Sequence, residues 1–227
     1  MNHYKCVIFD LDGTLANTKA GIVKGFEYAA KEMGFTYLPQ YENTIIGPSL
    51  IDSFRHLYKL PEQKAQEAVR QYRAYYAKQG MFEYSLYNGI EELIKTLRAQ
   101  SKILAVATTK YRKYALLMLQ ESKLLSYFDY VAGSNEDGSN AGKNELLAEV
   151  MKNTACSAAQ CVMIGDKHHD GQGAAHYHID FIWAKYGYGQ QSEMKDIPIK
   201  LVAENVNDIY RYLAEEDKIR NIAENER

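Results

Sequence analysis

Five short apolar runs, separated by helical patterns, constrain the fold of this chain more than any other feature. The runs are CVIF (6–9), ILAVA (103–107), YVAG (130–133), CVMIG (161–165) and DFIWA (180–184). Polar residues or glycine flank each run, as is typical of strands that are buried on both faces of a parallel sheet. Amphipathic helical patterns at 88–100, 113–121 and 144–152 separate the later runs. Alternating strands and helices predict an α/β fold with a doubly wound parallel sheet, a Rossmann-like core.

The gap between the first two runs predicts an inserted domain. The first run ends at Phe9 and the second begins at Ile103, which is too far for a single crossover. Helical patterns occupy 50–60, after a Gly47-Pro48 break, and 63–76, and we find no convincing strand in the gap. We therefore expect an all-helical cap over residues 19–87 and a core formed by residues 1–18 and 88–227. The charged tail EEDKIRNIAENER predicts a solvated helix.

Composition excludes several classes of partner. Apolar residues make up 46% of the chain and charged residues 25%, which is ordinary for a soluble globular protein. The net charge of −2 offers no attraction to nucleic acid or to an anionic membrane. Three cysteines (Cys6, Cys156 and Cys161) do not suggest a disulfide framework. We expect a cytoplasmic protein without nucleic-acid or membrane partners; the sequence does not indicate its oligomeric state.

Polar residues follow the apolar runs where a site is expected. Ligands of open α/β sheets bind beyond the carboxyl ends of the strands. The residues at these ends, together with one lysine at a helix start, are Asp10, Asp12, Thr108, Thr109, Lys110, Lys143, Asp166 and Asp170. Two unit charges ~5 Å apart repel by ~3 kcal/mol at an effective dielectric of about 20, so four carboxylates in one crevice require a cation. Oxygen ligands alone suit Mg²⁺.

Magnesium, carboxylates, a lysine and a hydroxyl together suggest phosphate chemistry. Mg²⁺ and Lys143 would neutralise phosphoryl oxygens, and Thr108 would donate a hydrogen bond. Asp10 and Asp12 lie two residues apart, roughly 6–7 Å along an extended chain. This spacing places a phosphoryl group beside Asp10 as nucleophile. Asp12 would then protonate the leaving alcohol and later deprotonate the hydrolytic water.

The motifs also resemble a known family. FDLDGTL resembles the first motif of the haloacid dehalogenase superfamily of phosphohydrolases, and a strand ending in Thr108, then Lys143, then GDKHHD follow in the family's order. TIIGPSLIDSF (44–54), LYNGIEELIKTL (86–97) and VATTK (106–110) are similar to the phosphoglycolate phosphatase and 5′-nucleotidase branch, which carries a helical cap. The resemblance covers nearly the whole chain. Asn17, which stands where an acidic residue is frequent, and His168 and His169 depart from the pattern and bear on substrate choice.

The resemblance implies a role for each motif residue. Asp10 is the nucleophile and Asp12 the acid and base. Thr108 and Lys143 hold phosphate; Thr109 is a further phosphate-binding candidate, with helix N-capping as its alternative. The expected magnesium-binding residues are Asp10, Asp12 through its backbone carbonyl, and Asp166, with Asp170 supporting the metal or Lys143.

The expected function is that of a Mg²⁺-dependent phosphatase of small phosphorylated metabolites, such as phosphoglycolate, a nucleoside monophosphate or a sugar phosphate. The alternatives are a sugar phosphomutase of the same fold and a non-catalytic α/β binding module. The spacing of His168, His169, His176 and His178 does not match zinc ligands, so we expect surface or internally paired histidines. We assign Arg55, Arg73 and Lys110 to solvated faces.

Overall fold

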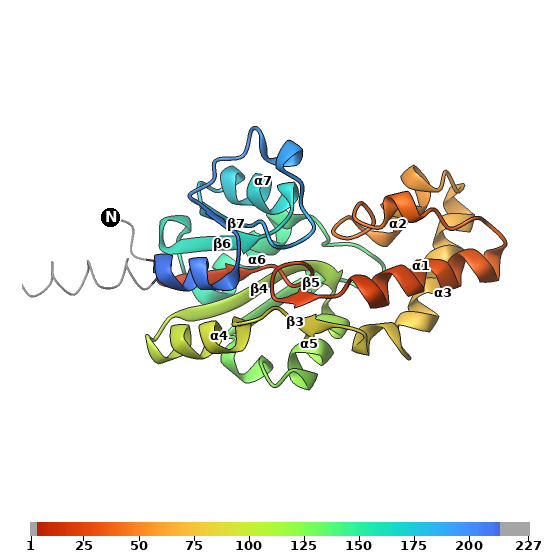
Figure 1. Ribbon diagram of the computed structural model, residues 1–227. Coiled ribbons are helices and arrows are strands. Elements are labelled where there is room, and N and C mark those ends of the chain that lie inside the picture. Colours follow the sequence, from red (N-terminus) through yellow and green to blue (C-terminus); the bar gives the residue numbers. More distant parts are fainter. Residues whose placement is uncertain (1–3, 214–227) are drawn as a thin grey trace, which may run out of the picture.

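A single parallel sheet forms the centre of the protein in the computed structural model, which describes residues 4–213. Its six strands follow the order β5-β4-β1-β6-β7-β8, and every pairing is parallel (Figure 1). The strands are β1 (Cys6–Phe9), β4 (Ile103–Tyr111), β5 (Tyr130–Ser134), β6 (Cys161–Gly165), β7 (Asp180–Ala184) and β8 (Leu201–Ala203). The prediction of a doubly wound α/β core is confirmed.

Helices cover both faces of this sheet because side chains alternate along each strand. Val7 and Phe9 of β1 pack with α4 (Ile90–Ala99), α5 (Arg112–Glu121) and a helix over 206–213. Cys6 and Ile8 face the other way, toward α6 (Lys143–Thr154) and α7 (His168–His176). Both clusters are buried, which is why the strand is apolar at every position. Short 3₁₀ turns complete the core: η4 (Leu125–Tyr127), η5 (Ala158–Gln160) and η6 (Gln191–Met194).

The cap segment leaves and re-enters the core through a two-stranded ribbon. Strand β2 (Ala16–Asn17) pairs antiparallel with β3 (Ser85–Leu86). Between them lie α1 (Lys19–Met33), η1 (Pro39–Tyr41), α2 (Leu50–Asp52), η2 (Ser53–Leu57, a π-helical turn), α3 (Glu62–Tyr76) and η3 (Gly80–Phe82). These elements bury an apolar cluster of their own around Phe26 and Phe54. The proposed boundary at residues 18/19 and 87/88 stays a prediction.

Three details differ from the sequence-based expectations. Strand β4 continues through Thr108 and Lys110 to Tyr111 instead of ending at Ala107. The expectation of no strand in the gap is wrong for β2 and β3, and β8 was missed. With two, two and three residues respectively, these strands are too short for an alternating pattern to reveal. The tail predicted as a solvated helix lies outside the described residues.

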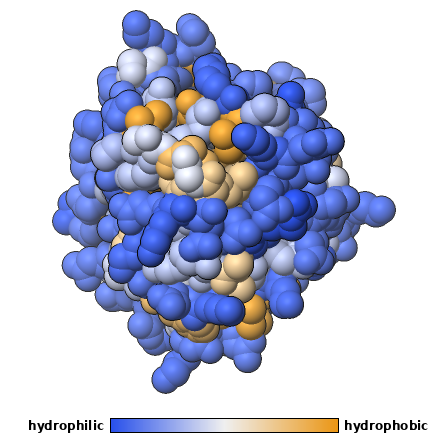
Figure 2. Space-filling view, turned by 90° about the vertical axis from the view of Figure 1, so that its right-hand side faces the viewer, coloured by the Kyte–Doolittle hydropathy of each residue, from blue (hydrophilic) through white to orange (hydrophobic). Residues whose placement is uncertain are grey.

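The cap end of the molecule presents a mostly hydrophilic surface, with a small group of apolar side chains in its upper middle (Figure 2). Within residues 4–213, no helix combines the length and the apolar character that a membrane span requires.

Candidate active site

Three buried carboxylates meet at the carboxyl edge of the sheet. Asp10 follows β1, Asp166 follows β6, and Asp170 lies in the first turn of α7. One oxygen from each carboxylate lies within 4.8 Å of the others. Asp10 is 4% exposed, and Asp166 and Asp170 are 0% exposed. The cluster therefore concentrates negative charge where water cannot screen it.

Lys143 contacts this cluster directly. Its Nζ lies 3.1 Å from Asp10 Oδ1 and 2.7 Å from Asp170 Oδ1, and it donates to the carbonyl of Ala107 at 2.7 Å. Burial opposes the charge of Lys143, but Asp10 and Asp170 outweigh burial and raise its pKa above the usual value. Lys143 thus remains charged within the site.

One lysine does not neutralise three carboxylates. Burial, followed by the neighbouring Asp170, raises the pKa of Asp10 to about 7, although Lys143 opposes this shift. Burial also raises the pKa of Asp166, and Asp170 and Asp10 add to the effect. Asp166 Oδ2 accepts from the backbone N–H of Tyr188 at 2.7 Å, whereas its buried Oδ1 has no hydrogen-bond partner within residues 4–213. An oxygen-only cluster with an unpartnered oxygen could hold a metal ion.

Asp12 makes a separate ion pair. Both of its carboxylate oxygens accept from Lys110 Nζ at 2.9 Å, and the two side chains are only 11% and 7% exposed. Lys110 Nζ also lies 4.9 Å from the ring centroid of Tyr76 on α3. The expectation of a solvated Lys110 is wrong because β4 extends past it and the cap covers it. The side chain of Asp12 lies apart from the cluster of three, so only its backbone could join a metal there.

The two threonines after Ala107 have different surroundings. Thr108 is 1% exposed, and its Oγ1 accepts from the backbone N–H of Lys110 at 3.2 Å. Within residues 4–213 the Thr108 hydroxyl donates no hydrogen bond of its own. Thr109 Oγ1 donates to the carbonyl of Gly47 in the cap at 2.8 Å. Helix N-capping by Thr109 is wrong, because α5 begins only at Arg112.

A tyrosine-glycine loop after β7, YGYGQ (186–190), encloses Asp166 and was missed by the sequence analysis. A Cβ on Gly187 would lie 2.3 Å from the carbonyl oxygen of Gly13, so only glycine fits there. The hydroxyl of Tyr188 accepts from the backbone N–H of Thr18 at 2.8 Å and donates to Asn17 Oδ1 at 2.8 Å. The glycines on both sides of Tyr188 are the sequence signal that could have indicated this loop.

The segment 167–169 contacts the cap. Lys167 Nζ donates to the carbonyl of Asn43 at 2.8 Å. Gly47, with φ of +111°, packs so closely on His169 that a Cβ would lie 2.9 Å from its ring. Burial lowers the pKa of His169 to about 4, and its Nε2 lies 3.8 Å from Asp170 Oδ1. The expectation of a surface or internally paired histidine is wrong for His169, because the cap covers it and its Nε2 has no hydrogen-bond partner among the described residues.

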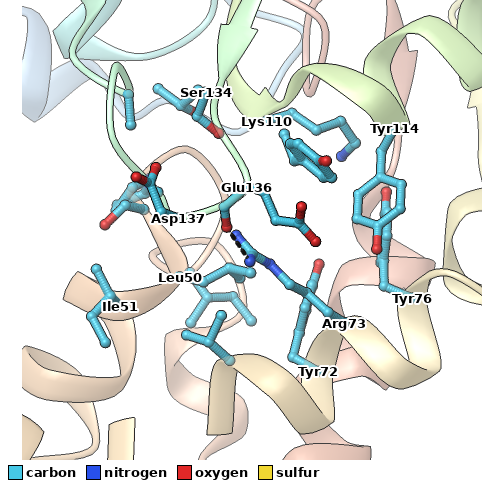
Figure 3. A pocket seen from close by; sticks show the side chains of 18 of the residues that line it. Leu50, Ile51, Tyr72, Arg73, Tyr76, Lys110, Tyr114, Ser134, Glu136 and Asp137 are labelled. Atoms are coloured by element: carbon cyan, nitrogen blue, oxygen red, sulfur yellow. Dashed lines mark hydrogen bonds between the residues drawn. The ribbon is translucent and has the colours of Figure 1, made fainter. Parts of the chain in front are cut away.

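A pocket of about 510 Å³ opens between the cap and the core. Asp12, Thr109 and Lys110 line it on the core side, and α3 lines it on the cap side (Figure 3). Arg73 belongs to this lining, so assigning it to a solvated face is wrong. Arg55 pairs with Glu62 at 3.0 Å and also borders the pocket.

A parallel sheet with carboxylates, a buried lysine and a threonine at its carboxyl edge, beneath a helical cap, is the arrangement of a capped phosphohydrolase with a doubly wound α/β core. Comparison with known families gives the same class. The model described as "Haloacid dehalogenase-like hydrolase" matches residues 7–184. The chain belongs to this family.

The similar proteins include named phosphohydrolases and one named kinase. The chain is 32% identical to the 5′-nucleotidase of Pseudomonas aeruginosa over 194 residues, which cover 85% of this chain and 87% of that protein. It is 36% identical to Tyrosine-protein kinase PtkA of Mycobacterium tuberculosis over 186 residues, 81% of this chain but only 63% of PtkA. The crystal structure of a predicted phosphatase from Clostridium acetobutylicum matches with a TM-score of 0.89 at 32% identity, covering 94% of this chain and 99% of that chain.

These findings confirm three expectations from the sequence. The family and the fold class are as predicted, and the chain is an enzyme, a phosphoric monoester hydrolase. The alternative of a non-catalytic binding module is not supported.

Proposed function

We propose that the protein is a Mg²⁺-dependent phosphatase of small phosphate monoesters that acts through an aspartyl-phosphate on Asp10. The substrate class comprises phosphoglycolate, nucleoside monophosphates and sugar phosphates. The observation that carries this proposal is the cluster of Asp10, Asp166 and Asp170, three buried carboxylates within 4.8 Å with Lys143 in contact with two of them. A phosphoryl group needs this combination of nucleophile and cations.

The metal site would comprise side-chain oxygens of Asp10, Asp166 and Asp170 and the backbone carbonyl of Asp12. The buried, unpartnered Oδ1 of Asp166 supports this assignment. Magnesium bound there would neutralise charge on the phosphoryl oxygens.

The chain's own residues would carry out two displacements. In the first, a carboxylate oxygen of Asp10 bonds to phosphorus while the ester P–O bond breaks, and Asp12 gives the leaving alkoxide a proton that it took from water in the preceding turnover. In the second, Asp12 takes a proton from a water molecule that attacks phosphorus. This attack breaks the bond to Asp10 and releases inorganic phosphate. Lys143 and the hydroxyl of Thr108 would hold the phosphoryl oxygens in both steps.

The name of the Pseudomonas aeruginosa relative, 5′-nucleotidase, supports nucleoside monophosphates as one member of the substrate class. A sugar phosphomutase of the same fold would need a bisphosphate activator. Release of inorganic phosphate without such an activator therefore separates the two functions.

The Asp10→Asn substitution tests the proposal. It is nearly isosteric but removes the nucleophile, so we expect kcat to fall by about 10³-fold or more with an unchanged circular dichroism spectrum. The matched control is Asp196→Asn, at an exposed aspartate away from the cluster. Near-normal turnover in Asp10→Asn would exclude the aspartyl-phosphate.

Magnesium dependence is tested separately. Chelation of divalent ions should abolish activity, and Mg²⁺ should restore it. Asp166→Ala should raise the Mg²⁺ concentration that gives half-maximal activity, because an oxygen ligand is lost. An unchanged Mg²⁺ titration would remove Asp166 from the metal site.

A further inference from the structure

Four tyrosines form a continuous aromatic wall along the pocket. Ring centroids lie 5.3 Å apart for Tyr72–Tyr76, 5.4 Å for Tyr76–Tyr114 and 5.2 Å for Tyr111–Tyr114. Tyr72 and Tyr76 belong to α3 of the cap, whereas Tyr111 ends β4 and Tyr114 lies on α5 of the core. All four line the pocket, but Tyr72 and Tyr76 are buried at 4% and 1% exposure, whereas Tyr111 and Tyr114 are partly exposed. Figure 3 shows the rings of Tyr72, Tyr76 and Tyr114 beside the pocket. We call this set the tyrosine wall.

Two cations lie against rings of the tyrosine wall. Lys110, which holds Asp12, is 4.9 Å from the ring centroid of Tyr76. The guanidinium carbon of Arg73 is 5.7 Å from the ring centroid of Tyr111. Arg73 Nη1 donates to the carbonyl of Glu136, but its buried Nε has no hydrogen-bond partner among the described residues. A ligand acceptor near the wall would satisfy this donor.

The residues that line the pocket suit the leaving group better than the phosphoryl group. Asp12, the proposed acid for the leaving oxygen, lines the pocket, whereas Asp10 is not part of its lining. Its volume of about 510 Å³ corresponds to about 17 water molecules at ~30 Å³ each. A two-carbon leaving group would fill a small part of this space. A sugar bearing a planar base would reach the rings.

We infer that the leaving group is a nucleoside, whose base packs on the partly exposed end of the tyrosine wall, Tyr111 and Tyr114, while Arg73 donates to an acceptor on the base. This inference rests on the proposed phosphatase function and selects one member of its substrate class. Aromatic rings bind any planar base through its π-face, so the wall would accept several bases. The shared chemistry is a planar aromatic ring on the alcohol, and an aryl phosphate such as phosphotyrosine is the other source of it.

The test compares phosphate esters with and without a planar base on the alcohol. Wild-type kcat/KM should be about tenfold or more higher for adenosine and uridine 5′-monophosphates than for ribose 5-phosphate, which keeps the ester and the sugar but lacks the base. Phosphoglycolate should be poorer still. Equal values with and without the base would overturn the inference. So would a higher kcat/KM for phosphotyrosine than for both nucleotides.

Variants of Tyr114 connect this preference to the wall. Tyr114→Leu should reduce the ratio of nucleotide to ribose 5-phosphate kcat/KM several-fold, and Tyr114→Phe, which keeps the ring, should retain the ratio. Tyr28→Leu is the matched control, since Tyr28 is a cap tyrosine that stacks on Tyr75 at 5.6 Å and does not line the pocket. An unchanged ratio in Tyr114→Leu would overturn the role of the wall.

Acetyl phosphate distinguishes failure of the nucleoside inference from failure of the proposed phosphatase function. Hydrolysis of acetyl phosphate and phosphoglycolate without a preference for nucleotides would overturn only the nucleoside inference. Failure to release phosphate from any compound, with Mg²⁺ present, would overturn the proposed phosphatase and this inference with it.

Discussion

Lys110 Nζ lies 2.9 Å from both carboxylate oxygens of Asp12 and 4.9 Å from the ring centroid of Tyr76 in the cap. One core side chain therefore contacts both the proposed acid and base and the lid that covers it. The position of the lid and the orientation of Asp12 are linked through this lysine.

Replacing Lys110 should weaken the reaction without unfolding the protein. Lys110→Met removes a charge-assisted hydrogen bond worth about 1.5–3 kcal/mol, so we expect kcat/KM to fall by roughly 10- to 100-fold. Lys110→Arg should recover part of the loss. Steady-state kinetics on a nucleotide and on acetyl phosphate measure the effect. Lys113→Met, at an exposed lysine on α5, is the control; an equal loss there would refute a specific role for Lys110.

The Asp12→Asn substitution should affect poor leaving groups most. An alkoxide needs a proton as it departs, whereas 4-nitrophenolate does not, so acid catalysis of about 10²- to 10⁴-fold should be lost mainly with alkyl phosphates. The measurement is kcat/KM across phosphate esters of graded leaving-group pKa. A steeper dependence on leaving-group pKa than in the wild type is expected. Parallel lines for the two proteins would indicate that Asp12 has only a structural role.

Magnesium should stabilise the protein more at neutral than at acidic pH. The metal-free fold raises the pKa of Asp10 from 3.8 to about 7, so between these values the folded state binds more protons than the unfolded state. Stability then falls as pH rises through this range. The raised pKa of Asp166 acts in the same direction.

Thermal unfolding with Mg²⁺ or with a chelator tests this pH dependence of stability. The increase in Tm from Mg²⁺ should be larger at about pH 7.5, where the cluster has lost protons, than at about pH 5. Asp166→Asn should reduce the difference between the two pH values. An equal increase at both would show that the carboxylates do not exchange protons for the metal.

Removing the hydroxyl of Tyr188 should loosen the start of α1. Tyr188→Phe loses the bonds to the backbone N–H groups of Thr18 and Lys19 at 2.8 and 3.1 Å but keeps the backbone bond to Asp166. We expect about 1 kcal/mol of destabilisation, faster hydrogen exchange at the start of α1, and an unchanged Mg²⁺ titration.

The control for this prediction is Tyr186→Phe in the same loop, which loses a bond to the carbonyl of Thr14 at 3.0 Å but none to α1. Fast hydrogen exchange at the start of α1 in both variants would show that any disturbance of this loop loosens α1, not the loss of the Tyr188 hydroxyl in particular. A shifted Mg²⁺ titration in Tyr188→Phe would show that the hydroxyl also supports Asp166.

The core could be predicted from short sequence patterns because the burial of each strand determines which residue types it contains. The run CVIF is apolar throughout because β1 is buried on both faces, and the residue after each strand lies at the carboxyl edge. This rule alone brought together Asp10 and Asp166. Lys143 was included only through the order of the motifs, and the structure places it between Asp10 and Asp170.

Contacts between distant residues were not predictable in this way. Lys110 and Asp12 are 98 positions apart, and although both follow predicted strands, nothing in the sequence indicates that they form an ion pair. A lysine in a polar stretch is usually solvated, and only the fold of the cap over β4 buries this one. Tyr188 likewise acquires its role from a loop that returns to Asp166 and Thr18. Such pairings depend on tertiary geometry.

The β2–β3 ribbon has a consequence for how such enzymes diversify. Ala16 pairs with Leu86 and Asn17 with Ser85, so the chain leaves the sheet and returns to it at one place. The entropy of closing a loop grows only with the logarithm of its length, so the stem tolerates inserts of very different size. Evolution can therefore graft a new lid onto this stem and change which molecules are admitted, while the inherited reaction centre below is left untouched.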